Sequence, residues 1–134
     1  MSDYSPTEIT TIELQYFQKL CYDESVALGW HKNNKTGLPF TEEEKEERFP
    51  MRISLCHSEI SEALNAHRTD AMDDHLPHRL GAEVELADAI IRIFDLGETM
   101  GYDLATAMYE KLEYNRQRKD HKVENRNKKG GKKY

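Results

Sequence analysis

Hydrophobic positions along the chain recur at three- and four-residue intervals, the spacing of amphipathic helices, and no segment alternates as a strand would. The first such segment ends near Leu28–Gly29. It follows Ser5-Pro6-Thr7-Glu8, which combines a capping box with proline at the first helical position. The pattern therefore predicts a long first helix. Its apolar positions are Ile9, Ile12, Tyr16 and Leu20.

A second helical pattern follows a loop. The stretch Trp30–Phe40 is rich in Asn, Lys, Gly and Pro and is typical of a connection. A second capping box, Thr41–Glu44, then starts the next helix. Pro50 interrupts this helix either as a kink or as the restart of a longer one. Helical spacing continues over Met51–His67, and the polar residues from 69 to 78 predict a connection.

Two further helices complete the pattern. Gly81–Met100 is apolar over more than one face, so we expect it to be buried in the centre of the fold or in a subunit interface. Gly101 is typical of a helix end and Asp103 of a helix start, which predicts a fourth helix from Leu104 to about Arg118. The sequence thus predicts an all-α fold, a four-helix bundle in one domain over residues 1–119, followed by a tail over 120–134.

Charge divides the chain of 134 residues and net charge −6 into two parts. From residue 111 onward there are ten Lys or Arg against three acidic residues, whereas the rest holds nine basic and 22 acidic residues. An acidic body excludes a duplex nucleic-acid binder, which would be basic over a whole face. The division favours a cation site in the body and an anion-binding or freely solvated tail.

The cellular setting is inferred from what the chain lacks. No run approaches the ~20 apolar residues of a membrane span. The first residues show no secretory signal. Cys21 and Cys56 form neither a disulfide framework nor a CxxC metal pair. We therefore expect a cytoplasmic protein that does not bind a membrane.

Two pairs of carboxylates are the strongest chemical signal. Glu59 and Glu62 lie three residues apart on the second helix, as Glu85 and Asp88 do on the third. This spacing places each pair on one helical face. Because a short connection makes the two helices antiparallel, the four carboxylates are expected to converge. Oxygen ligands without Cys or His favour a hard cation, Mg²⁺ or alternatively Mn²⁺.

A basic stripe on the fourth helix suits phosphate. Lys111, Asn115 and Arg118 are four and three residues apart and share one face. A point charge, a neutral amide and a guanidinium fork together can hold a polyphosphate. An ordinary solvated face is the alternative. Polyphosphate needs both a divalent cation and basic side chains, so the two features support each other.

From Leu28 to Arg118 the chain resembles the MazG-like all-α nucleoside triphosphate pyrophosphohydrolases, a family that includes dimeric dUTPases, dCTP pyrophosphatases and phosphoribosyl-ATP pyrophosphohydrolases. The resemblance rests on E-x-x-E, E-x-x-D and K-x-x-x-N-x-x-R in this order, carried by the residues just described. It implies hydrolysis of a (d)NTP to the monophosphate and pyrophosphate, for control or cleansing of the nucleotide pool. It also implies a bundle completed by oligomerisation, as a homodimer or a dimer-of-dimers tetramer.

The resemblance further implies residue roles. Glu59, Glu62, Glu85 and Asp88 would hold the metal, with Glu62, or else Glu59, as the catalytic base for the attacking water. Lys111, Asn115 and Arg118 would hold phosphate oxygens. The segment with Trp30, His31 and Asn33 would contact base and sugar, although Trp30 can equally anchor its loop. Arg52 and His57 lie near the acids and either support them or simply pack or face solvent.

Two other functions remain open from the sequence. One is a catalytically weak regulator that binds nucleotides with the same fold. The other is a helical interaction module whose acidic stripe is surface. Metal-dependent pyrophosphate release separates the enzyme from both.

Overall fold

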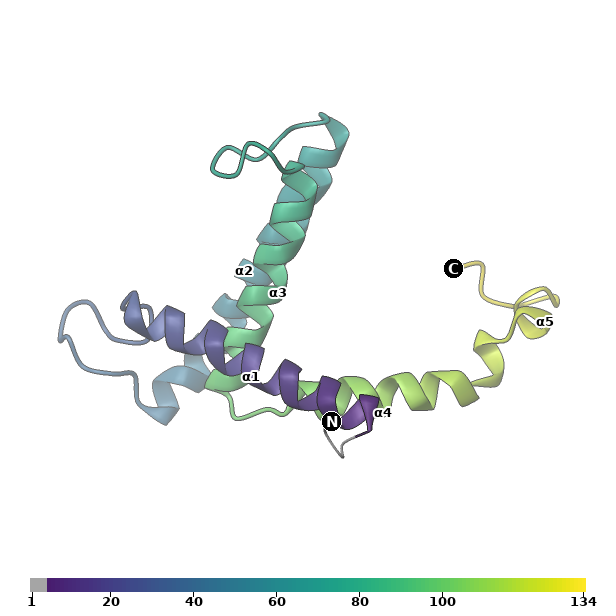
Figure 1. Cartoon of the computed structure of the whole chain (residues 1–134), viewed down its shortest axis with the longest axis horizontal. Coiled ribbons are helices and arrows are strands. Elements are labelled where there is room, and N and C mark those ends of the chain that lie inside the picture. Colours follow the sequence, from purple (N-terminus) through teal and green to yellow (C-terminus); the bar gives the residue numbers. More distant parts are fainter. Residues whose placement is uncertain (1–4) are drawn as a thin grey trace.

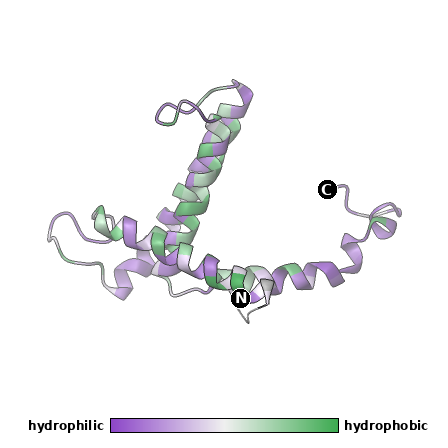
Figure 2. Ribbon diagram, in the orientation of Figure 1, coloured by the Kyte–Doolittle hydropathy of each residue, from purple (hydrophilic) through white to green (hydrophobic). Residues whose placement is uncertain are grey.

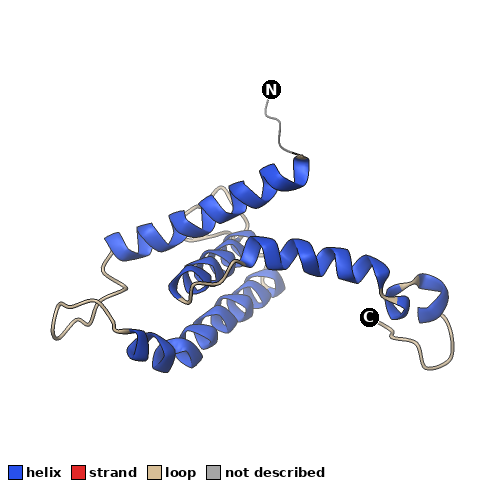
Figure 3. Ribbon diagram, turned by 90° about the horizontal axis from the view of Figure 1, so that it is seen from below, coloured by secondary structure: helices blue, strands red, loops and turns tan. Residues whose placement is uncertain are grey.

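The computed structural model describes residues 5–134, and helices dominate this part of the chain. The elements in order are α1 (Pro6–Ala27), α2 (Glu42–Arg68), α3 (Gly81–Thr99), α4 (Leu104–Gln117), the 3₁₀ turn η1 (Lys119–His121) and α5 (Val123–Arg126). The described residues contain no strand, only two isolated bridges in loops (Figure 3). The predicted all-α class is confirmed.

The predicted helix starts are confirmed by their hydrogen bonds. In α1 the Glu8 backbone N–H donates to Ser5 Oγ (3.2 Å), and the Ser5 N–H donates to the Glu8 carboxylate (2.7 Å). Thr41 and Glu44 make the same reciprocal pair at the start of α2. Such caps stabilise a helix because its first N–H groups have no partner within the helix.

Pro50 and Gly101, two residue types that often interrupt helices, behave differently here. Pro50 lies inside α2, which runs unbroken from Glu42 to Arg68, so proline neither ends nor restarts the helix. Gly101 has φ +70°, a conformation that favours glycine, and it turns the chain between α3 and α4. Asp103 then accepts a bond from the Thr106 N–H and begins α4.

α2 and α3 form an antiparallel pair that projects away from the other helices (Figure 1). Their direction is evident from two ion pairs, because Glu59 faces Arg92 and the earlier residue Arg52 faces the later residue Asp95. α1 packs against α3 and α4. Beyond α1, α4 runs away from the α2–α3 pair in both views (Figures 1 and 3).

The core of the single chain is thin. The accessible surface is 10656 Å², whereas a compact monomer of this mass exposes about 7,300 Å². Along α3 an apolar stripe at positions i, i+4 and i+7 stays 44–49% exposed. In Figure 2 the green of hydrophobic residues recurs along the α3 ribbon. The buried apolar residues of the described part are Cys21, Cys56, Ala63, Ala89, Phe94, Leu96 and Ala105, and the exposed stripe is Leu86, Ile90 and Ile93.

The basic tail has local structure of its own. Asp120 accepts bonds from Arg118 and pairs with Lys132 (2.8 Å), and Asn125 donates to the Lys119 carbonyl. The two cations beside it hold the pKa of the Asp120 carboxyl far below its usual range. Within residues 5–134, no helix is both long and apolar enough to cross a bilayer.

Candidate functional site

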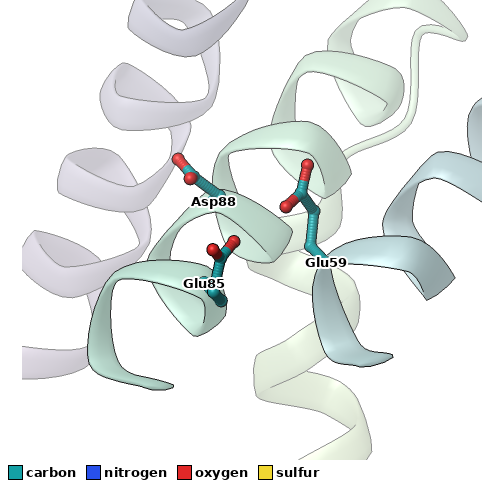
Figure 4. Close-up of side chains that lie close together, drawn as sticks. All are labelled: Glu59, Glu85 and Asp88. Carbon is teal, nitrogen blue, oxygen red and sulfur yellow. The ribbon is translucent and has the colours of Figure 1, made fainter. Parts of the chain in front are cut away.

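Three of the four predicted carboxylates meet between α2 and α3. Glu59 reaches from α2 toward α3, from which Glu85 and Asp88 project one turn apart (Figure 4). One oxygen from each residue lies within 4.8 Å of the others. Glu59 is buried, Glu85 is partly buried and Asp88 is exposed, so the cluster is open to solvent on one side. This group could hold a metal ion.

The fourth carboxylate, Glu62, lies at the edge of the same group. Its side chain is exposed. A hydrogen bond with Glu59 and the charge of that neighbour raise the pKa of Glu62. Glu62 is therefore in contact with the cluster, although it does not belong to the three residues whose oxygens converge most closely.

The protonation of the cluster reflects crowding of like charges. Burial, a hydrogen bond with Glu59 and the surrounding carboxylates raise the pKa of Glu85 to about 7. Burial and the charge of Glu59 also raise the pKa of Asp88. Burial acts in the same direction on Glu59, but hydrogen bonds from Arg92, Glu62 and Glu85 outweigh it and leave its pKa lowered. With a pKa of about 7, Glu85 keeps its proton in part at neutral pH, and a divalent cation can replace that proton.

Arg92 joins the carboxylates to a pocket that the sequence patterns did not reveal. Its Nε donates to Glu59 Oε1 at 2.5 Å, and its guanidinium also lines a cavity of about 410 Å³. We call this cavity the arginine pocket; its lining residues are Ser25, Trp30, Arg48, Met51, Arg52, Leu55, Arg92 and Asp95. Acidic cluster and arginine pocket are thus neighbours along the same pair of helices.

Spacing contained a signal for this pocket. Arg48 and Arg52 are four residues apart, and Glu59 follows Arg52 by seven, so all three share one face of α2. On α3, Arg92 follows Asp88 by four and lies on its face as well. Isolated arginines at helical spacing are common on solvated surfaces, so the spacing alone does not distinguish a pocket from a solvated face, whereas the bond from Arg92 to Glu59 and the shared cavity do.

The predicted base-binding segment divides into three environments. Trp30 lines the arginine pocket and is 67% exposed. His31 is buried, and its Nε2 lies 2.7 Å from Oδ1 of Asp95, which lines the pocket. Asn33 uses its side-chain oxygen to accept from the Lys35 N–H within the loop. Of the three residues, Trp30 offers free surface to a ligand in this chain.

The predicted phosphate-binding stripe lies on another part of the molecule. Lys111 Nζ sits 4.6 Å from the centre of the Tyr114 ring, and Arg118 pairs with Asp120. Asn115 Oδ1 is buried without a hydrogen-bond partner. Because α4 packs on α1 and extends away from α2 and α3 (Figure 1), this stripe and the acidic cluster do not meet within one chain.

The description of the fold and of the acidic cluster rests on the geometry of this chain. Comparison of the chain with models of known protein families, with curated proteins and with solved structures finds no match.

Proposed function

We propose that the protein hydrolyses a nucleoside or deoxynucleoside triphosphate to the monophosphate and pyrophosphate, with Mg²⁺ held by the acidic cluster. The observation that carries this proposal is the convergence of Glu59, Glu85 and Asp88 on two antiparallel helices, beside a pocket lined with arginines. The ordered motifs that resemble MazG-like pyrophosphohydrolases agree with it. A cluster of carboxylates alone would support only metal binding.

The donor set suits a hard cation. Every nearby ligand atom is a carboxylate oxygen, and no Cys or His belongs to the cluster among residues 5–134. Mg²⁺ prefers such ligands and commonly binds through a few carboxylates together with substrate phosphates. When bound, it would neutralise phosphate charge and acidify a water molecule.

The protein's own groups would then serve as catalytic base, as metal ligands and as a stabiliser of phosphate charge. Glu62 is exposed at the edge of the cluster and has a raised pKa, which suits a base that accepts the proton of the attacking water. Glu85 and Asp88 would give up their protons on binding the cation and hold it as ionised ligands. The guanidinium of Arg92, which is partly exposed at 44%, is close enough to the cluster to stabilise developing negative charge on a phosphate.

We further propose that the working unit is a homo-oligomer, either a dimer or a dimer of dimers. The excess of about 3,400 Å² over a compact monomer exceeds what one partner contributes to an obligate dimer, up to about 2,500 Å². The exposed stripe on α3 is the natural contact for a second copy because burial of its side chains is favourable. A partner would also allow α4 of one chain to approach the cluster of another.

The test is release of pyrophosphate from a panel of nucleoside and deoxynucleoside triphosphates. We expect turnover of at least one member with Mg²⁺ and none with excess EDTA. Glu85→Gln should reduce turnover by at least about 100-fold because it removes a metal ligand, in line with the loss on removing one group that stabilises the transition state. Glu83→Gln on the exposed face of the same helix is the matched control and should leave turnover unchanged.

The outcomes discriminate between functions. Phosphate release without pyrophosphate would contradict the proposed bond cleavage. Binding of nucleotide without turnover would favour a regulator. Equal turnover by wild type and Glu85→Gln would show that the acidic cluster is not the site.

A further inference from the structure

The arginine pocket continues directly from the acidic cluster. Arg52 lies seven residues before Glu59 on α2, which is about 10 Å along the helix axis. Arg92 contacts both regions, since it donates to Glu59 and lines the pocket. If the phosphates of a nucleotide lie at the cluster, as the proposed function requires, its sugar and base extend toward this pocket. The cavity of about 410 Å³ falls within the range of small-molecule sites.

Free hydrogen-bond donors characterise the pocket. Arg48 Nε is buried and has no partner, and the Arg48 guanidinium is held 4.2 Å from the centre of the Phe40 ring. Arg52 makes only long bonds of 3.4 Å, to Asp95 and to the Trp30 carbonyl. These two guanidiniums therefore retain donor capacity for a ligand.

Acceptors in the same pocket are fewer than the donors, and they already hold protein partners. Asp95 pairs with His31 through one oxygen at 2.7 Å and with Arg52 through the other. The Trp30 carbonyl accepts from Arg52. Asp95 Oδ2 keeps a further acceptor site, but this one carboxylate faces three guanidiniums in the pocket, so N–H donors outnumber acceptors there. The pocket therefore favours a ligand edge made of acceptors.

Most of the remaining lining is apolar. The Trp30 indole is 67% exposed, and Met51 and Leu55 are about 40% exposed beside it. An exposed indole stacks on planar rings, and a guanidinium does so as well. A planar ring with acceptors along one edge combines both properties of the pocket.

We propose that the arginine pocket binds the nucleobase and selects 6-oxopurines, the class of guanine and hypoxanthine. Their O6 and N7 are adjacent acceptors that match one arginine fork. Adenine places an amino donor where guanine has O6, and cytosine presents an amino donor as well. The inference rests on the proposed function only for the direction in which the nucleotide lies.

Trp30 allows a direct test because it is the only tryptophan in the chain. Its fluorescence is titrated with dGMP, dIMP, dAMP, dTMP and 7-deaza-dGMP, which have no pyrophosphate to release. N-acetyltryptophanamide corrects for absorption by the nucleotides. We expect dGMP and dIMP to quench Trp30 with a Kd lower by about 10-fold or more than that of dAMP, the range for one bidentate contact. Loss of N7 in 7-deaza-dGMP should remove most of this difference.

Arg48→Met tests the donor itself. It retains an unbranched side chain beside Phe40 but removes every N–H, so we expect similar Kd values for dGMP and dAMP. Arg68→Met makes the same change at an exposed position near the other end of α2 and should preserve the selectivity. Far-UV circular dichroism confirms that both variants keep their helices.

The results separate the two proposals. Equal quenching by dGMP and dAMP, tighter binding of dTMP, no quenching by any nucleotide, or unchanged selectivity in Arg48→Met would each overturn the inference. Pyrophosphate release without base selectivity would leave the proposed hydrolysis standing and refute the selective pocket. Selective binding of dGMP without any pyrophosphate release would do the opposite.

Discussion

Replacement of Ile90 by aspartate should separate the chains of the proposed oligomer. Ile90 lies in the middle of the exposed apolar stripe of α3 and is 49% exposed in one chain. Because it is already half exposed, Ile90→Asp places its carboxylate in solvent in an isolated chain and should disturb that fold little. In an interface the same carboxylate would be buried without a partner.

The size of the effect follows from these exposures. Burial of the remaining half of an isoleucine side chain contributes about 1 kcal/mol, and an unpaired buried carboxylate adds at least about 2 kcal/mol. In a twofold-symmetric dimer both copies carry the substitution, so the two losses of about 3 kcal/mol add to about 6 kcal/mol per dimer. Because each 1.4 kcal/mol is tenfold, dimer affinity should fall by about four orders of magnitude.

Light scattering after size exclusion and sedimentation equilibrium measure the result. Wild type should have at least twice the chain mass of 15.7 kDa, and its melting temperature should rise with protein concentration. Ile90→Asp should run at 15.7 kDa. Val123→Asp, the same kind of change at an exposed residue of α5, is the control and should remain assembled. Wild type at the mass of one chain at every concentration, or an Ile90→Asp protein that stays assembled, would refute the reasoning.

Three further predictions concern the acidic cluster and the join between α3 and α4. In EDTA the free energy of unfolding by urea should fall as pH rises from about 4.5 to 7, because folded Glu85, with its pKa raised to about 7, retains a proton that the unfolded chain releases. Saturating Mg²⁺ or Glu85→Gln should flatten this slope. A slope unchanged by Glu85→Gln would contradict the attribution of the pH dependence to Glu85. Arg92→Met should raise Mg²⁺ affinity in calorimetry because Arg92 competes for Glu59, and weaker binding would show that Arg92 supports the ligands instead. Gly97→Ala should lower the free energy of unfolding by about 1–3 kcal/mol, since its Cβ would lie 2.5 Å from Leu104 Cδ1 and 2.9 Å from Cγ; an unchanged urea midpoint would show that Leu104 moves away freely.

Local chemistry made much of this fold predictable. Ser5 and Thr41 indicate helix starts because their side chains accept hydrogen bonds from backbone N–H groups three residues later. The structure contains both capping boxes. The pairing of Glu59 with Glu85 and Asp88 was predictable for a similar reason, since two helices joined by a short connection pack antiparallel. In each case the relevant partners are close in sequence.

Other features depend on how distant segments meet. Nothing in the spacing of the loop residue His31 indicates Asp95, which lies 64 residues later and holds it at 2.7 Å. The direction of α4 is set by the turn at Gly101, so the relation of Lys111 to the cluster could not be inferred from helical spacing. The sequence predicted that α3 is too apolar for solvent, and the exposed stripe shows that one chain does not cover it.

The position of the cluster between two consecutive helices has a consequence for how the protein folds. Glu59, Glu85 and Asp88 all fall within one helical hairpin, α2 and α3 with the loop between them. Contacts of short sequence separation form early because little chain entropy is lost in closing them. We therefore expect the hairpin to be the first part of the chain to form, with the carboxylates already facing one another. Cation binding during synthesis would then stabilise this hairpin and guide the docking of the segments that follow.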